Sequence, residues 1–164
     1  MTADLLVKLY DLDDKIEGLD KLKEDNIRIV RALAVDKSRI IDFIMEEFEI
    51  NWANEFERAL FNDPTSCFIA IKDKEVVGFA CYDATGKGFF GPTGVSDKVR
   101  GKGVGKVLLL KCLLDMKENG YGYAIIGGAS DAIEFYSKVA GATIIPDSYP
   151  GIYGRMIAGE FEDK

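Results

Sequence analysis

The strongest chemical signal in the sequence is a glycine-rich stretch, VRGKGVGK at residues 99–106. Gly101, Gly103 and Gly105 alternate with other residues and would let a ligand come close to the backbone, because glycine has no Cβ atom. A helix that begins directly behind such a stretch offers unpaired N–H groups and a positive dipole end to an anion. The stretch therefore predicts a phosphate-binding turn.

The spacing of these residues excludes two common phosphate-binding motifs. A Walker A loop needs glycine where Arg100 stands and a hydroxyl residue where Val107 stands. A dinucleotide-binding fingerprint needs its third glycine at Lys106 or at Leu108, and neither is glycine. The pattern that remains is Arg-x-x-Gly-x-Gly, over residues 100–105.

The composition removes several other kinds of chemistry. The 164 residues contain no histidine, which excludes serine–histidine triads, histidine bases and imidazole zinc sites. The three cysteines, Cys67, Cys81 and Cys112, have a spacing typical of neither a disulfide framework nor a metal knuckle, so we expect core residues in a reducing cytoplasm. With a net charge of −7 and no long apolar run, we expect no nucleic-acid partner and no membrane partner. The missing histidine and the cysteine spacing lead us to expect no metal.

Apolar periodicity predicts the elements that would position the glycine stretch. Residues 1–25 are interpreted as an N-terminal extension and residues 26–164 as one domain. Asp36 and Asp131 are expected to begin helices, the second as a capping-box variant with Glu134. The other expected helices cover 51–61 and 102–119, and the expected strands cover 27–33, 66–72, 75–84, 88–95, 123–126, 142–145 and 151–159. This order predicts a single α/β domain of the mixed α+β kind.

Two motifs about 30 residues apart give the chain a resemblance to the GNAT superfamily of N-acetyltransferases. Arg-x-x-Gly-x-Gly, after a strand that ends at Val95, resembles the pyrophosphate loop of that family. SDAIEFYSKVAGA, residues 130–142, resembles its second core segment, a helix with an Ala-Ile-x-Phe-Tyr run. The resemblance implies a central, mixed, mostly antiparallel sheet flanked by helices, with splayed strands at the cofactor site.

The resemblance also implies acetyl-CoA (CoA) as the acyl donor. Its pyrophosphate would lie on backbone N–H groups of the glycine stretch, and its pantetheine arm would run beside the preceding strand. Ser130 would take over a contact made by an asparagine in many members, because that position is Ala129 here. The cofactor-binding residues implied in this way are Thr93, Gly94, Val95, Arg100, Gly101, Lys102, Gly103, Val104, Gly105, Lys106 and Ser130.

Transfer to an amine needs a proton acceptor, a polarised thioester carbonyl and a proton for the leaving thiolate. Tyr136 stands where the family has its general acid, and a phenol can donate a proton at neutral pH. Backbone N–H groups near Val95 would bind the carbonyl oxygen as charge develops. Some members carry a glutamate, which acts as the base, five residues before the position of Val95. That residue is Phe90 here, so Asp83 or a water chain is left as the base.

The function implied is acetyl transfer from acetyl-CoA to an amine acceptor, expected to be a small molecule, by direct attack on the thioester. Two interpretations stay open beside it: a non-catalytic acyl-CoA-binding regulatory module on the same fold, and a nucleotide-binding protein. The oligomeric state is also left open, with a homodimer as one option. Residues expected near the acceptor are Phe48, Asn51, Trp52, Tyr149, Tyr153 and Arg155.

Overall fold

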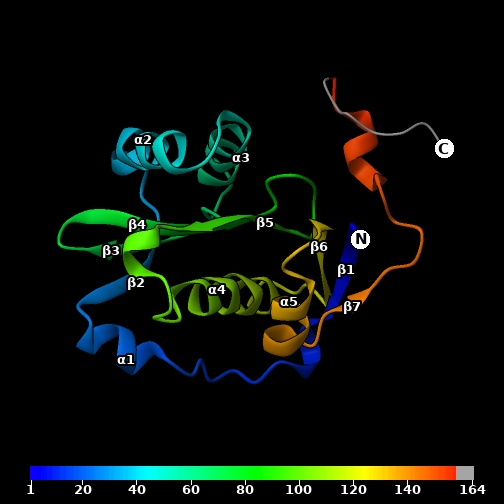
Figure 1. Cartoon of the computed structure of the whole chain (residues 1–164), viewed down its shortest axis with the longest axis horizontal. Coiled ribbons are helices and arrows are strands. Elements are labelled where there is room, and N and C mark those ends of the chain that lie inside the picture. The colour runs from blue at the N-terminus through cyan, green and yellow to red at the C-terminus, as the bar shows by residue number, and fades with distance from the viewer. Residues whose placement is uncertain (158–164) are drawn as a thin grey trace.

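The computed structural model describes residues 1–157, and these residues form one seven-stranded sheet with helices on both faces (Figure 1). The strand order is β2-β3-β4-β5-β6-β1-β7, and only the β5–β6 pair is parallel. The predicted fold class is therefore confirmed. The strands are β1 (Ala3–Lys8), β2 (Ile27–Arg31), β3 (Cys67–Lys72), β4 (Glu75–Tyr82), β5 (Phe89–Val95), β6 (Tyr123–Ala129) and β7 (Thr143–Ile144).

Two separate apolar cores lie on the two faces of this sheet. The helices α2 (Lys37–Glu47) and α3 (Ile50–Leu60) cover one face, and α1 (Leu19–Glu24), α4 (Val104–Glu118) and α5 (Ile133–Ala140) lie on the other (Figure 1). Ile40, Ile44 and Phe56 are fully buried on the first face, and Leu108 and Leu113 on the second. Each helix therefore turns an apolar stripe toward the sheet.

Local patterns in the sequence located most of these elements. The β3–β4 hairpin turns at Asp73 and Lys74, which both have positive φ angles, as a two-residue turn of this kind needs. The helix predicted over 102–119 is α4, which ends at Asn119 and is followed by Gly120 with φ +92°. The cysteines are all buried, as expected, on β3, β4 and α4.

Two predicted helix starts are wrong in detail. Asp36 precedes α2 but its side chain forms no capping hydrogen bond, and α5 begins after Ala132 rather than at Asp131. In both cases the residue at the cap position has φ near −95° and ψ near 5° (Asp36 −97° and 5°, Ala132 −94° and 4°). A capping side chain reaches the first N–H groups from an extended backbone, which neither residue has.

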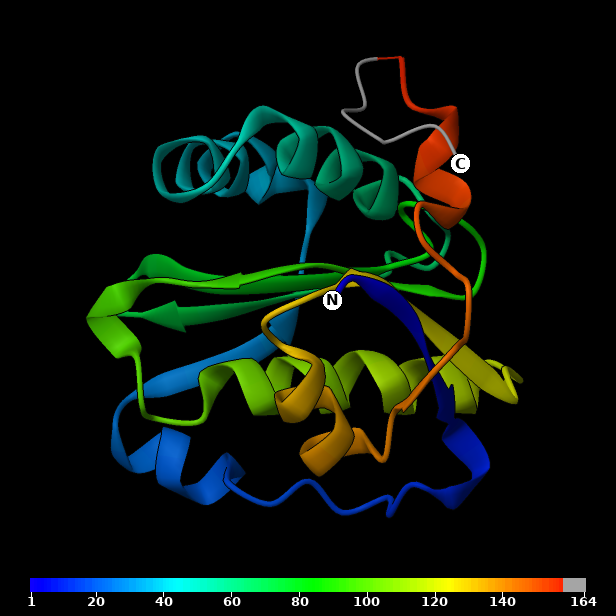
Figure 2. The same ribbon diagram turned by 45° about the vertical axis from the view of Figure 1, so that its right-hand side comes forward.

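The N-terminal strand accounts for the largest difference from the expected topology. β1 pairs with β6 on one side and β7 on the other, so residues 3–8 lie inside the sheet (Figure 2). From β1 the chain passes along the outer side of α4 to reach α1 and β2 (Figure 2). The proposed boundary after residue 25 stays a prediction, but the preceding segment supplies a strand that the sheet uses.

The two strands expected at the end of the chain are mostly wrong. Only Thr143–Ile144 of the first is a strand, and Gly151–Arg155 of the second is a 3-10 helix, η4, while residues 158–159 lie outside the described residues. The edge of β6 is already paired with β1, and Pro150 and Gly151, with φ +57° at the glycine, turn the chain away from the sheet. No helix within residues 1–157 is long and apolar enough to cross a bilayer.

A buried carboxylate joins β1 to the neighbouring segments. Asp4 is 8% exposed, and its Oδ1 accepts a hydrogen bond of 2.8 Å from the N–H of Gly128 in β6. Its own N–H donates to Ser148 Oγ at 2.8 Å, and a Cβ atom at Gly151 would lie 3.0 Å from its Oδ2. Asp4 therefore holds the C-terminal end of β6 and the segment before η4 in place.

Replacing Asp4 tests this role. Asp4→Ala leaves the Gly128 N–H without its acceptor, so we expect a loss of about 1–3 kcal/mol in the free energy of unfolding, whereas Asp4→Asn keeps an acceptor and loses less. Urea denaturation measures both, with the exposed Asp11→Ala as the control, expected within about 0.5 kcal/mol of the parent. Equal stability of the Asp4→Ala and Asp11→Ala proteins would contradict this assignment.

Candidate active site

The site begins where β5 and β6 separate. Their pairing covers only Phe89 with Ile125 and Phe90 with Ile126, although both strands continue beyond these residues. At the same point the β4–β5 register shifts, so that Gly91 and Pro92 together stand opposite one residue of β4. This is a β-bulge, in which proline lacks an N–H and Gly91 has φ +115°. The bulge bends β5 away from β6 and opens the sheet.

The separation leaves backbone groups of β5 without a strand partner on the β6 side. Ser96 donates its N–H to Val77 of β4 at 2.9 Å. In an antiparallel ladder successive residues point their N–H groups to opposite sides, so the N–H of Val95 points toward the gap. The N–H of Thr93 points the same way. Such an edge can bind an extended chain that carries amide groups.

A cavity of about 690 Å³ occupies the gap between the two strands. Residues from β5, β6, α3, α5 and the segments before and within η4 line it, so it brings together parts of the chain more than 100 residues apart. Of the predicted site residues, Thr93, Ser130 and Tyr136 lie in this wall, together with Trp52, Tyr149 and Tyr153 from the expected acceptor side.

Tyr136 reaches the cavity from α5. Its ring packs edge-to-face against Phe90, with 6.2 Å between the ring centroids, and the residue is 8% exposed. Burial raises the pKa of the Tyr136 hydroxyl above its usual value, so the phenol stays protonated at neutral pH. No hydrogen bond joins this hydroxyl to another residue in the described part of the chain. It is therefore available to a molecule in the cavity.

The glycine stretch lies at the other end of β5, beside the beginning of α4. Gly101 and Gly103 have φ angles of +76° and +83°, and nothing would lie within 4 Å of a Cβ atom at either position. A Cβ at Gly105 would lie 3.5 Å from Val95 Cγ2, which puts the stretch next to the end of β5. From Phe90 to Val95 the strand spans about 16 Å. One strand thus connects the cavity to the anion-binding turn.

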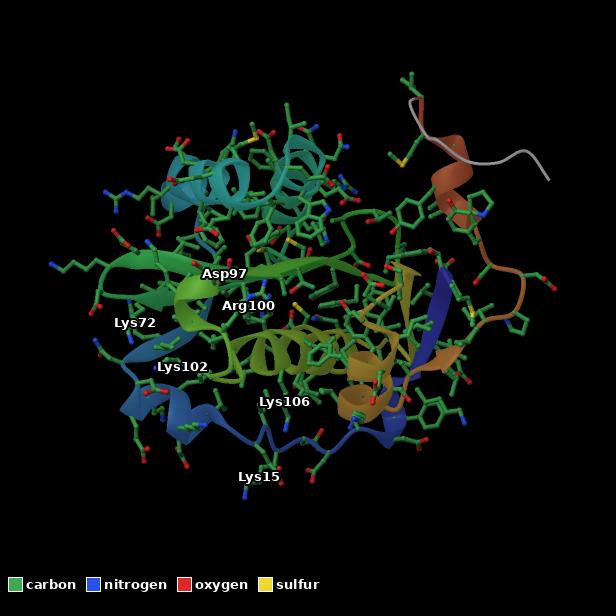
Figure 3. The ribbon with its side chains drawn as sticks, viewed as in Figure 1. Lys15, Lys72, Asp97, Arg100, Lys102 and Lys106 are labelled. Atoms are coloured by element: carbon green, nitrogen blue, oxygen red, sulfur yellow. The ribbon has the colours of Figure 1, made fainter. Side chains whose placement is uncertain are left out.

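The charged side chains of this turn have different surroundings (Figure 3). Arg100 forms an exposed ion pair with Asp97, and Lys102 lies 3.3 Å from Asp25 near the end of α1. Lys106 lies in the first turn of α4 (Figure 3). Val104 is buried in the core, so only its backbone faces a ligand. The backbone N–H groups therefore remain the main anion-binding feature of the turn.

Packing against Phe48 explains why residue 94 is a glycine. A Cβ atom there would lie 2.4 Å from Phe48 Cζ. The Phe48 ring packs between Trp52 and Phe79, with centroid distances of 5.2 and 5.9 Å. Phe48 does not line the cavity of about 690 Å³, nor a second cavity described below, whereas Trp52 lines both. Phe48 thus acts in the core, and Gly94 lets α2 and α3 pack close to β5.

A second cavity of about 480 Å³ shares a wall with the first. Four residues line both cavities: Trp52, Glu55, Thr85 and Tyr153. Asn51 and Arg155, which the sequence analysis placed near the acceptor, line the second cavity. The two cavities together form a path from the surface beside α3 to the gap between β5 and β6.

Tyr153 closes this wall from η4. A Cβ at Gly127 would lie 2.6 Å from the Tyr153 hydroxyl oxygen, and one at Gly128 would lie 3.2 Å from its ring. The two glycines of β6 therefore leave room for this ring. Burial, followed by the charge of Glu55, raises the pKa of Tyr153 to about 12.

Glu55 is a site residue that the sequence analysis missed. Its Oε1 accepts a hydrogen bond from Thr85 Oγ1. Burial and the nearby charge of Glu49 raise its pKa, and the Thr85 hydrogen bond opposes them. The available signal was helix periodicity, because Glu55 lies three and four residues after Trp52 and Asn51 and so shares their face of α3.

Asp83, the carboxylate suggested as a base, lies elsewhere. Its side chain accepts hydrogen bonds from the Gly88 N–H at 2.7 Å and from the Tyr121 hydroxyl. It lines neither of the two cavities described above. Asp83 therefore organises the β4–β5 connection. Residues 1–157 contain no group of three or more carboxylates and cysteines arranged to hold a metal ion.

Comparison with known proteins agrees with this fold. The profile of the acetyltransferase (GNAT) family matches residues 20–142, and the chain therefore belongs to that family. No curated protein matches the chain. Among solved structures, the GCN5-related glucosamine N-acetyltransferase region of a fungal multi-domain β-N-acetylglucosaminidase aligns with a TM-score of 0.71 at 15% identity, over 88% of this chain and 20% of that one.

Two bacterial structures of the same kind have similar coverage. A GCN5-related N-acetyltransferase from Sphaerobacter thermophilus aligns with a TM-score of 0.67 at 17% identity, over 88% of this chain and 48% of that one. Another from Kribbella flavida aligns with a TM-score of 0.57 at 14% identity, over 87% and 54%. The chain thus spans from a fifth to about half of these proteins, and at such identities the likeness concerns the fold.

The glycine stretch yields a direct prediction. Gly105→Ala adds only a methyl group in ordinary contact with Val95, so we expect the fold to be kept and CoA to bind at least about 10-fold more weakly, since the methyl would stand between backbone and phosphate. Gly103→Ala should weaken binding too, with about 1–2 kcal/mol of added backbone strain at its positive φ. Isothermal titration calorimetry measures both affinities.

Gly120→Ala is the matched control for this strain, because Gly120 also has a positive φ and lies at the far end of α4. We expect its stability to fall as that of Gly103→Ala does, with CoA affinity unchanged. CoA affinity equal to the parent in both Gly103→Ala and Gly105→Ala would show that the turn does not hold the pyrophosphate.

Proposed function

We propose that this protein transfers an acetyl group from acetyl-CoA to the amine of a small molecule, by direct attack on the thioester. The observation that carries the proposal is the gap between β5 and β6, which continues into a cavity lined by Tyr136 and lies beside an anion-binding turn. Membership of the GNAT family supports the same chemistry. The proposal includes a cytoplasmic location, which rests on the number and spacing of the cysteines.

The residues around the gap fit an extended donor with a phosphate group at one end. The turn at Gly101 and Gly103 has open space over its backbone, and the N–H groups of α4 begin directly behind it. The edge of β5 can pair with the amides of the pantetheine arm, and Ser130 offers a hydroxyl across the gap. When bound, acetyl-CoA would supply the thioester that the amine attacks.

The chain's own groups can assist two steps of this reaction. The N–H groups of Thr93 and Val95 face the gap and can donate to the carbonyl oxygen as negative charge develops there. Thr93 and Tyr136 line the same cavity, and Val95 does not line it. The Tyr136 hydroxyl can give its proton to the departing thiolate, because burial keeps this phenol protonated.

Two measurements on the intact chain test the proposed function. Acetyl-CoA should raise the melting temperature, since it binds only the folded state, and a panel of primary amines should cause release of free CoA thiol. Protection by CoA without thiol release in any amine would favour a non-catalytic CoA-binding module. Protection by ATP or NAD but not by CoA would favour a nucleotide-binding protein.

Replacement of Tyr136 tests its role as the acid. Tyr136→Phe keeps the packing against Phe90 and deletes only the hydroxyl, so we expect the rate at saturating acetyl-CoA to fall by about 10²- to 10⁴-fold with little change in CoA affinity. Tyr123→Phe, an exposed tyrosine at the other end of β6, is the control and should be unchanged. A loss below about threefold for Tyr136→Phe would leave solvent as the proton source.

A further inference from the structure

We propose that Glu55 binds the acceptor as an ammonium ion and then takes its proton, so that the cavity wall shared by Trp52, Glu55 and Tyr153 is the acceptor site. The inference rests on the proposed function and deepens it, because it assigns both the base and the charge of the acceptor. The acceptor class that follows is a primary amine, protonated in solution and carried on an apolar group.

The position of Glu55 carries the first step of the argument. It is the only lysine, arginine, aspartate or glutamate that lines both cavities in the described part of the chain, so an acceptor moving along the path between them must pass it. We call the cavity of about 690 Å³ the inner cavity and the second, of about 480 Å³, the outer cavity. Asp131 lines only the inner cavity, and Glu49 and Arg155 line only the outer one. Glu55 is thus at the junction of the two.

The second step concerns the missing partner of this carboxylate. Glu55 is half-buried, and within residues 1–157 no lysine or arginine forms an ion pair with it. Its hydrogen-bond partner is the neutral hydroxyl of Thr85. A carboxylate removed from water without a cation is unfavourable, and an ammonium ion in the cavity would complete the pair. The acidic chain, with net charge −7, also attracts cations.

The neighbouring rings determine what the amine is attached to. Trp52 and Tyr153 line both cavities together with Glu55, and Phe135 and Tyr149 line the inner one. Ammonium ions bind favourably over aromatic rings, which also bury the carbon groups next to the nitrogen. An apolar aryl or alkyl group beside the amine fits this lining.

The reaction balances with three proton transfers, two from the acceptor nitrogen and one from Tyr136. The acceptor ammonium gives one proton to the Glu55 carboxylate, and the neutral amine attacks the thioester carbonyl carbon. The C–N bond forms and the C–S bond breaks. The thiolate leaves with the proton of the Tyr136 hydroxyl, and the second proton of the attacking nitrogen then restores that hydroxyl. Proton transfer turns an ion pair into two neutral groups, which burial favours, and Glu55 then returns its proton to solvent.

The groups around Glu55 define the expected pH dependence. Glu49, directly before the same helix, carries a negative charge, and Arg155 lines the outer cavity. Cys81 of β4 and Tyr153 of η4 stay neutral because burial raises both of their pKa values. The base must be ionised, so kcat/KM should fall as the pH drops through the pKa of Glu55, which burial raises above its usual value.

The first experiment measures binding without turnover. Trp52 is the single tryptophan, so its fluorescence reports occupancy of the wall beside Glu55. The chain saturated with CoA is titrated with 2-phenylethylamine, a cation at neutral pH, and with 2-phenylethanol, its neutral analogue. We expect Glu55→Gln to weaken the amine at least about 10-fold and the alcohol less than about twofold. Equal amine affinities of the parent and Glu55→Gln proteins would overturn the proposal, whether or not the chain is active.

The second experiment measures turnover with the same amine and acetyl-CoA. Glu55→Gln should lower kcat/KM by about 10²- to 10⁴-fold and remove the acidic limb of the pH profile. Thr85→Val should move that limb to higher pH, because the lost hydrogen bond favours the ionised carboxylate. Glu57→Gln removes the same charge from a half-exposed position of α3, where it pairs with Lys37, and should stay within about twofold of the parent.

The outcomes separate this inference from the proposed function. Turnover of the parent with an unchanged rate and pH profile in Glu55→Gln would overturn the role of Glu55 and leave the proposed function standing. Binding that depends on Glu55 without thiol release from any amine would overturn the proposed function and the proton transfer with it. If Glu55→Gln melts more than about 5 °C below the parent, Glu55→Asp replaces it, and full activity of that shortened carboxylate at every pH would count against a positioned base.

Discussion

The separation of β5 from β6 is the constraint on which the rest of the site depends. Two strands in the middle of a sheet normally satisfy each other's backbone groups, and here the pairing ends after Phe90 and Ile126. The bulge at Gly91 and Pro92 makes this separation local, because β5 stays paired with β4 on both sides of the bulge although the register shifts there. The open edges can then be satisfied by an extended ligand, which is why a defect in pairing is also a binding feature.

The sheet tolerates this gap because its other connections are strong. β1 pairs with β6 along the edge that faces away from the gap, and Asp4 accepts the Gly128 N–H near the point where β6 is free of β5. The same carboxylate lies against Gly151, directly before the 3-10 helix that carries Tyr153. The N-terminal strand therefore supports both the free end of β6 and the aromatic side of the acceptor wall, although the family match begins only at residue 20.

Features that depend on residues close together in the sequence could be predicted, and features that depend on contacts between distant residues could not. The glycine stretch, the hairpin turn and α4 are specified by residues close together in the chain, and all were located correctly. The place of β1 beside β6 depends on pairing across more than 100 residues, which no periodicity reports. The same competition for the edge of β6 made residues 151–155 a helix rather than a strand. The family resemblance does not point to Glu55, because it lies on α3 and not on the strand that carries a glutamate in some family members.

The gap also explains how helices from opposite faces of the sheet can contribute to one reaction. α3 lies on one face and α5 on the other, and an intact sheet would keep Glu55 and Tyr136 apart (Figure 1). Where β5 and β6 part, both residues line the same cavity. An acceptor approaching along α3 and a donor lying toward α4 and α5 would meet in the plane of the sheet. Direct transfer between two bound molecules is the chemistry that such a two-sided opening favours, because neither has to displace the other.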